Sequence, residues 1–286
     1  MLTGIVRDDR YLEHMPGHSH PEHPSRLRTI HDMLDNTPAG NFIRIPAELA
    51  TLEELELVHT PTYIKKVLKT AEQTHTSLAP DTPACARSYV SAWLAVGGCL
   101  RALDALVQRR CEACFCLVRP PGHHALPDRA GGFCFFNNLG VAAQTAATKY
   151  GIRKILIIDW DVHHGNGLQD LFYSDPSVLY FSSHDMLLYP YSGAMEETGT
   201  GSAAGYTVNI PLQRRFEDED ILHVYREILP AVIRRFEPEL ILVAAGFDAH
   251  KEDPIGRSRM TTQGIEEIED NVARADFPVD EIVALQ

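Results

Sequence analysis

Three polar side chains follow a buried, strand-like run and could together bind a metal ion. Asp159, Asp161 and His163 come directly after the apolar run Ile155–Ile158. Because consecutive side chains of a strand alternate between its faces, this spacing predicts that all three point to one side. Buried charges of this kind are costly unless a partner compensates them. The pattern therefore indicates a divalent metal site, and the alternative is a solvated turn whose acids cap the following helix.

A second apolar run supplies a third candidate ligand. A catalytic zinc ion commonly has three nitrogen or oxygen ligands from the protein and a fourth position for water. Asp248 follows the run Leu240–Phe247, and ligands of open α/β sheets bind at the carboxyl ends of the strands. With Asp161 and His163 it completes a set that suits zinc or ferrous iron. Taken alone, Asp248 is equally consistent with the N-cap of a helix.

Two adjacent histidines lie in a loop that prolines make rigid. The segment Arg119–Ala125 reads RPPGHHA and follows the strand-like run Cys114–Val118. Two prolines followed by glycine favour a fixed, non-helical loop. His123 and His124 have the pKa range needed to take a proton from a metal-activated water and to protonate a leaving amine. The alternative is a surface pair without a catalytic role.

Six short motifs follow one another along the chain, namely RPPGHHA, GFCFFNN, IDWDVHHGNG, YPYSG, YTVNIPL and AAGFDAHKEDP. In this order they resemble the zinc-dependent histone deacetylase and acetylpolyamine amidohydrolase family, over roughly residues 18–285. The Gly-Asn-Gly ending of the third motif resembles class II and bacterial members. The resemblance implies an α/β fold of the arginase and deacetylase type, with three α/β/α layers around a mostly parallel sheet in a single catalytic domain over residues 1–286.

The resemblance also implies roles for the candidate residues. Asp161, His163 and Asp248 would bind one zinc ion, which would polarise the amide carbonyl and activate the attacking water. His123 and His124 would form the acid and base pair. A structural potassium ion is also expected, and the residues around it would be Asp159, Asp161, His163 and Ser182.

Two further residues would orient the histidine pair in this family pattern. Asp159 would hold the outer nitrogen of His123, and Asn166 that of His124, which fixes each ring and its tautomer. Because Asn166 is neutral, His124 would be the better general base.

The remaining family positions concern the substrate. Phe133 and Tyr189 would form aromatic walls of an acyl-lysine tunnel, next to Gly132. Asp81 would be a rim acid that accepts hydrogen bonds from substrate backbone amides, and Arg119 a basic residue at the foot of the pocket. The substrate would be an acetylated lysine peptide or an acetylated polyamine, and the tunnel residues do not decide between them.

The printed sequence ends in a strand-like run, Ile282–Gln286. Family members continue with a Gly-Gly-Tyr loop, whose tyrosine stabilises the oxyanion of the reaction, and with terminal helices. Loss of one oxyanion donor typically lowers the rate about 10²- to 10³-fold. We therefore expect zinc and substrate binding with slow turnover, unless another tyrosine substitutes or the sequence is a truncated piece.

Composition agrees with a cytoplasmic enzyme. The 286 residues carry a formal net charge of −13. The first residues do not resemble a signal peptide, so we expect neither export nor membrane insertion. The negative charge disfavours nucleic acid as a direct partner and favours a cationic peptide or polyamine. The six cysteines are predicted to be free thiols. Whether the chain forms an oligomer is left open.

Helical and strand-like spacings alternate, as in a doubly wound sheet. Helices are predicted at residues 88–107, 138–150, 217–236 and 262–275, and further strands at residues 178–182 and 207–210. The helix at residues 217–236 is expected to bury one face, made of Leu222, Val224, Ile228, Leu229, Val232 and Ile233.

Some motifs invite a different interpretation. The glycine-rich segment Gly199–Gly205 precedes a strand and opens no helix, so a nucleotide site is not expected. The cluster of His18, His20, Glu22 and His23 is interpreted as an irregular rim loop, with a second metal site as the alternative. His59 is expected to be structural. Three other histidines near the motifs are expected to point away from the metal, namely His164, His184 and His250.

Three functions remain open. The leading one is a zinc-dependent deacetylase that releases acetate from an acetylated amine. The second is a catalytically impaired scaffold of the same fold that binds zinc and acyl-lysine. The third is a ureohydrolase with two manganese ions, for which the single Asp-x-His pattern supplies too few carboxylates.

Overall fold

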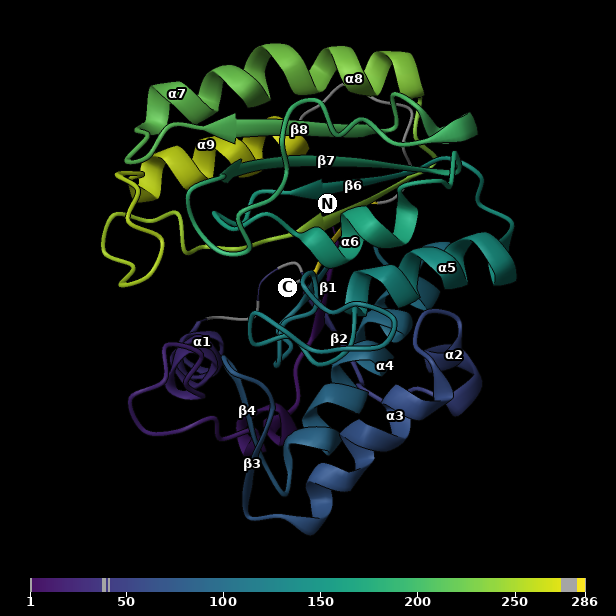
Figure 1. The fold of residues 1–286 in the computed structure, drawn as a ribbon, viewed down its shortest axis with the longest axis vertical. Helices are drawn as coiled ribbons and strands as arrows, with labels where there is room; N and C mark the ends of the chain where they lie inside the picture. The colour runs from purple at the N-terminus through teal and green to yellow at the C-terminus, as the bar shows by residue number, and fades with distance from the viewer. Residues whose placement is uncertain (1, 38–39, 41, 274–281, 286) are drawn as a thin grey trace. The chain divides into compact units, whose positions relative to one another are not determined.

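Parallel strands alternate with helices along the chain, as the apolar spacing predicts (Figure 1). The computed structural model describes residues 2–37, 40, 42–273 and 282–285. It divides into an N-terminal unit, Met1–Gly151 with Val283–Gln286, and a C-terminal unit, Ile152–Ile282. The structure is therefore an α/β fold built largely on parallel strands, which confirms the predicted fold class.

In the N-terminal unit, three parallel strands lie side by side. They are β2 (Phe42–Ile45), β1 (Thr3–Val6) and β5 (Ala113–Cys116), in this order. Helix α4 (Ser88–Val107) contacts all three strands, and α5 (Asn138–Tyr150) packs on α4. Both helices have the predicted bounds, α4 because of its long apolar spacing and α5 because it also has clear end signals. The amide side chain of Asn137 caps α5, and Gly151 ends it in a left-handed conformation.

Shorter elements surround these strands. They are η1 (Asp9–Glu13), α1 (Ser25–Asn36), α2 (Leu52–Glu56), α3 (Pro61–Leu68), η2 (Lys69–Glu72), β3 (His75–Ala79) and β4 (Thr82–Cys85). Strands β3 and β4 pair antiparallel as a hairpin whose tip is Pro80 and Asp81. Position 81 is therefore held by a paired element.

In the C-terminal unit, four parallel strands are adjacent in the order β9 (Leu240–Ala244), β6 (Ile155–Asp159), β7 (Val178–Asp185) and β8 (Thr207–Leu212). Every residue of β9, β6 and β7 is buried, as expected for central strands of a parallel sheet that is covered on both faces. Helix α6 (Asn166–Phe172) connects β6 to β7 and packs on β7.

The helix predicted at residues 217–236 has an interruption. Figure 1 shows α7 (Asp218–His223) and α8 (Leu229–Phe236) in line, and the π-helical turn η4 (Val224–Ile228) joins them. A π-helical turn adds a residue to the repeat and so changes which side chains face inward. The predicted core face is therefore partly wrong. Ile228 and Val232 are only half-buried, whereas Tyr225 and Phe236 are buried.

The remaining elements are η3 (Gly201–Ala203), which lies between β7 and β8, and α9 (Thr262–Ala273) and β10 (Ile282–Leu285), which follow β9. The last two residues predicted for the helix at 262–275, and Gln286 of the predicted last strand, lie outside the described residues. Within the described part, α4 is the one helix long and apolar enough to cross a membrane. Its side chains are mostly buried in the protein, like those of a core helix. The six cysteines are free and buried, as predicted.

Candidate active site

The predicted metal ligands lie just beyond the ends of two adjacent strands of the C-terminal unit. Strand β6 ends at Asp159 and strand β9 at Ala244. The chain bends directly after Asp159, so Asp161 and His163 belong to a loop. The prediction that three side chains share one strand face is therefore wrong. The loop nevertheless returns His163 toward Asp248, so the three predicted ligands lie together, and their role as metal ligands remains a prediction.

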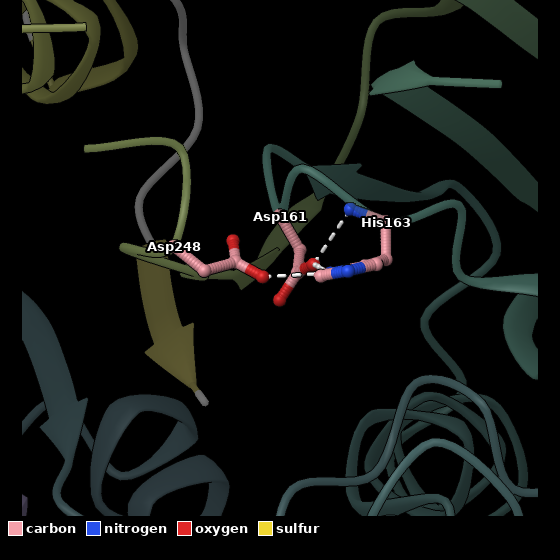
Figure 2. A group of neighbouring side chains, drawn as sticks. All are labelled: Asp161, His163 and Asp248. Atoms are coloured by element: carbon pink, nitrogen blue, oxygen red, sulfur yellow. Dashed lines mark hydrogen bonds and ion pairs between the residues drawn. The ribbon is translucent and has the colours of Figure 1, made fainter. Parts of the chain in front are cut away.

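Figure 2 shows the three side chains pointing toward one another. Atom Nδ1 of His163 lies 2.7 Å from Oδ2 of Asp248 and 3.1 Å from Oδ1 of Asp161. Two backbone amides orient the carboxylates, since Val162 donates to Asp248 and His163 donates to Asp161, at 3.0 and 2.8 Å. One ligand atom from each residue lies within 4.8 Å of the others.

The electrostatics of this cluster favour a bound cation. Burial and the neighbouring charge of Asp161 raise the pKa of Asp248 to about 6. Burial lowers the pKa of His163, but the hydrogen bonds and charges of the two carboxylates outweigh it and raise the pKa to about 11. Both shifts express an excess of negative charge in a poorly solvated place. The donor set, one imidazole and two carboxylates, fits a divalent ion such as zinc.

Asp159 lies deeper in the same unit and is fully buried. Its Oδ2 accepts a hydrogen bond from the Tyr180 hydroxyl at 2.9 Å, and its Oδ1 accepts from the backbone N–H of Asp161 at 3.3 Å. Burial and the Asp159 charge raise the pKa of Tyr180 well above its ordinary value, so this phenol stays a donor. Ser182 is buried nearby in the sheet, and its Oγ lies 2.9 Å from Nδ1 of His184. The potassium site at these residues remains a prediction.

The histidine pair belongs to the N-terminal unit. His123 and His124 are the central residues of a turn that a hydrogen bond from Ala125 N–H to the Gly122 carbonyl closes, at 3.0 Å. Both side chains are buried, and their ring centroids lie 3.9 Å apart. A side chain at Gly122 would collide with the first residues of α5, because its Cβ would lie 2.6 Å from the Asn138 nitrogen. The residue before the histidine pair, Gly122, therefore lies directly against the start of α5.

Arg119, which begins the histidine loop, makes a buried ion pair that the sequence did not indicate. Its guanidinium donates to both carboxylate oxygens of Glu22, at 2.5 and 2.7 Å, and also to the carbonyls of Tyr11, His14 and Glu22. Its predicted role at the foot of a pocket remains a prediction.

Glu22 is the residue that sequence reasoning missed. It lies in the segment interpreted as a rim loop, yet it is only 2% exposed. Burial alone would raise its pKa, but the hydrogen bond with His14 and the charge of Arg119 lower it to about 2. Two features of the sequence could have revealed it. Glu22 is the one acid in a proline-rich segment, and Arg119, directly before the rigid Pro120–Gly122 loop, needs an acidic partner if it is buried.

The predicted substrate residues Gly132 and Phe133 form a tight turn in the same unit. Gly131 and Cys134 exchange two backbone hydrogen bonds across it, at 3.3 and 2.9 Å. Both central residues have positive φ, +54° and +67°, as in a type I′ hairpin turn. Phenylalanine in this conformation costs about 1–2 kcal/mol, so the surroundings must support the turn. The Phe133 ring packs edge-on against His20, with centroids 4.6 Å apart.

The structure places the other predicted residues without testing their roles. Asp81 is half-buried at the hairpin tip, and its carboxylate faces the Gly132 amide at 3.1 Å. Tyr189 is 36% exposed in the loop after β7, and Asn166 is the first residue of α6. The predicted aromatic wall at Tyr189, and the predicted contact of Asn166 with His124, stay predictions.

Histidines that were not expected to bind the metal have other hydrogen-bond partners. His59 accepts a hydrogen bond from the Asn137 amide at 2.9 Å, as expected of a structural histidine. The nitrogens of His164 contact Ser192 and Gln169, and His184 contacts Ser182 and the Gly193 carbonyl. Among the described residues, the Asp, His, Asp set is the one metal-type cluster found, and the interpretation of the N-terminal histidines as a rim loop remains a prediction.

The chain is similar to proteins of known family. The family model described as histone deacetylase domain matches residues 20–286. A "Probable deacetylase" of Archaeoglobus fulgidus is 39% identical over 271 residues, which cover 94% of this chain and 75% of that protein. The "Polyamine deacetylase HDAC10" of Rattus norvegicus is 43% identical over 233 residues, which cover 75% of this chain.

The solved structure titled "Crystal Structure of HDA15 HD domain" has a TM-score of 0.91 and 36% identity to this chain, and the match covers 99% of this chain and 85% of the other. Several similar proteins are much longer. The matched regions make up 36% of the "Histone deacetylase HDA1" of Candida albicans and 38% of the rat protein.

Proposed function

Because the chain belongs to the histone deacetylase family, we propose that it is a zinc-dependent deacetylase that hydrolyses an acetylated amine to acetate and the free amine. The observation that carries the proposal is the convergence of Asp161, His163 and Asp248 within 4.8 Å. Zinc held there would act as a Lewis acid on the amide carbonyl and would lower the pKa of the attacking water.

The three ligands are suited to this ion and keep it accessible. Their side chains are 12–14% exposed, so they are shielded without being sealed from solvent. Backbone amides already orient both carboxylates, which reduces the cost of ordering them around an ion. Three protein ligands leave a coordination position for water or substrate.

His123 and His124 would move the protons. Hydrolysis breaks the amide C–N bond and adds the water oxygen to the carbonyl carbon. One proton must leave the water, and one must reach the amine nitrogen. The two rings lie beside each other, with centroids 3.9 Å apart, so one ring would serve as base and the other as acid.

We propose acetylated lysine peptides and acetylated polyamines as the substrate class. Basic residues of a lysine peptide and the unacetylated amines of a polyamine are cationic, and the chain carries a net charge of −13, which favours the approach of such substrates. The names of two relatives, a polyamine deacetylase and a histone deacetylase, support the same pair of substrate types.

The test is acetate release from an acetyl-lysine peptide and from an acetylated polyamine by the zinc-loaded chain, with Asp248→Ala as the blank. Asp175→Asn is the matched control, because Asp175 only accepts hydrogen bonds from nearby Ser177. Acetate release by the chain and by the control, but not by the blank, supports the deacetylase proposal. The substrate that is hydrolysed faster identifies the substrate class.

Metal content separates the alternatives. Bound zinc without acetate release would favour the binding scaffold. Two metal ions per chain would favour the ureohydrolase and would count against the proposal.

A further inference from the structure

Asp81 and Thr82 form a hydrogen-bonded ring with the Gly132–Phe133 turn in the N-terminal unit. The Asp81 carboxylate accepts from the Gly132 N–H at 3.1 Å, and the Thr82 hydroxyl oxygen accepts from the Phe133 N–H at 3.2 Å. The ring closes because the Thr82 hydroxyl donates to the other Asp81 oxygen at 2.8 Å. Both amides of the turn are therefore held by one pair of side chains.

The backbone conformation of the turn explains why these hydrogen bonds are needed. Phe133 has φ = +67°, a conformation that a bulky residue rarely adopts without support from its surroundings. The two amides point out of the turn and need acceptors. A charged acceptor at Asp81 makes a stronger hydrogen bond than a neutral one, and Thr82 is completely buried, so its geometry is fixed.

The Gly132–Phe133 turn lies directly against the His124 ring. A Cβ atom on Gly132 would be 2.1 Å from Cδ2 of the His124 ring and 2.9 Å from its Nε2. No atom fits between the Gly132 backbone and the imidazole. A shift of the turn must therefore displace the ring or open a gap beside it.

We propose that Asp81 and Thr82 are positioning residues for His124, and that they act through the Gly132–Phe133 turn. This inference rests on the proposed deacetylase function and deepens it. It gives Asp81 a role distinct from hydrogen bonding to a substrate backbone. The geometry also extends the site to Thr82, whose buried side chain cannot touch a substrate.

Thr82→Val is the decisive variant, because valine keeps the shape and removes the hydroxyl. We expect kcat to fall about 10- to 100-fold, since small displacements of a catalytic group have effects of this size, with KM changed less than about twofold. Thr82→Ser retains the hydroxyl and should restore most of kcat. Ser77→Ala is the matched control, because this hairpin hydroxyl contacts only the carbonyls of Ala79 and Thr82.

Two substrates separate positioning from substrate binding. For Asp81→Ala, positioning predicts an equal loss of kcat with an acetyl-lysine peptide and with an N-acetylated alkylamine that has no backbone amides. A pure rim role predicts a higher KM for the peptide alone and no effect of Thr82→Val. That second pattern would overturn the inference.

A readout independent of turnover keeps the two proposals apart. In the chain labelled with ¹⁵N-histidine, Thr82→Val should move the ring resonances of His124, assigned by His124→Gln. The resonances of structural His59 should stay in place, which excludes general unfolding. An unmoved His124 signal refutes positioning even if the wild-type chain releases no acetate, whereas absent acetate release with a moved signal refutes only the enzyme proposal.

Discussion

The Nδ1 atom of His163 lies 2.7 Å from the Oδ2 atom of Asp248, although 85 positions separate the two residues in the chain. The parallel pairing of β6 with β9 brings them together, because it aligns the carboxyl ends of both strands. The candidate metal cluster is thus a product of sheet register and not of a local motif.

This relationship predicts the effect of removing one ligand. Asp248→Ala should weaken zinc binding more than about 100-fold, beyond the loss expected for an outer hydrogen-bond partner. Isothermal titration calorimetry of the metal-stripped chain measures it, with Asp175→Asn as the control. Equal zinc affinity in the Asp248 variant would show that this cluster is not the metal site.

Gly132→Ala should lower kcat at least about 100-fold, because the added Cβ would enter the van der Waals space of the His124 ring. Gly151→Ala is the matched control. Gly151 also has a positive φ, +73°, but nothing lies within 4 Å of its Cβ position, so this variant has the backbone strain without the collision. Steady-state kinetics of both variants give the comparison, and equal activities would contradict the contact.

The buried ion pair of Arg119 and Glu22 should dominate the stability of its surroundings. Glu22→Gln leaves the Arg119 charge buried without its counter-ion, and we expect a loss of about 3–5 kcal/mol in the free energy of unfolding. Arg259→Ala breaks an ion pair with Glu217 whose side chains are 57% and 62% exposed, and it should cost less than about 1 kcal/mol. Urea denaturation measures both. A smaller loss for Glu22→Gln than for Arg259→Ala would refute the ranking.

His59 predicts a pH dependence of stability. Burial lowers its pKa to about 4, below the value of about 6.5 in an unfolded chain. The unfolded state therefore binds the extra proton first as the pH falls. The contribution of neutral His59 to the free energy of unfolding is fully present above about pH 6.5. It decreases as the pH falls toward 4, and about 2 kcal/mol is lost at pH 5.

His59→Gln tests this sign, since glutamine can still accept the Asn137 hydrogen bond but does not titrate. The variant should lose less free energy of unfolding between pH 7 and pH 5 than the parent chain, about 2 kcal/mol less. Parallel pH profiles of the two chains would show that His59 is not buried in its neutral form.

Much of this fold and site could be read from spacing along the chain. The helices at residues 88–107 and 138–150 have the predicted bounds, because their apolar spacing, and for the second its capping residues, are local signals. The sequence predicted which side chains form the Asp, His, Asp cluster, because each lies shortly after a strand-like run. Their loop geometry was not predicted, because nothing local shows that β6 stops at Asp159.

What could not be predicted depends on distant partners. Glu22 stands in a polar, proline-rich segment, and its burial depends on Arg119, 97 residues away. The link from Asp81 to the Gly132 amide spans 51 residues. The π-helical turn at residues 224–228 is the exception, because Pro230, whose missing N–H interrupts a regular helix, is a local signal that the helix prediction did not use.

The sheet register also orders events during synthesis. Asp161 and His163 leave the ribosome well before Asp248, which is 85 residues after His163. At ~5–20 residues per second, this interval is about 4–17 s. During that time the nascent chain would offer the proposed zinc ion only two of its three ligands, and the third would arrive with β9. Loading of the proposed site would thus follow the pairing of β9 with β6, and a half-made chain would exchange metal with the cellular pool.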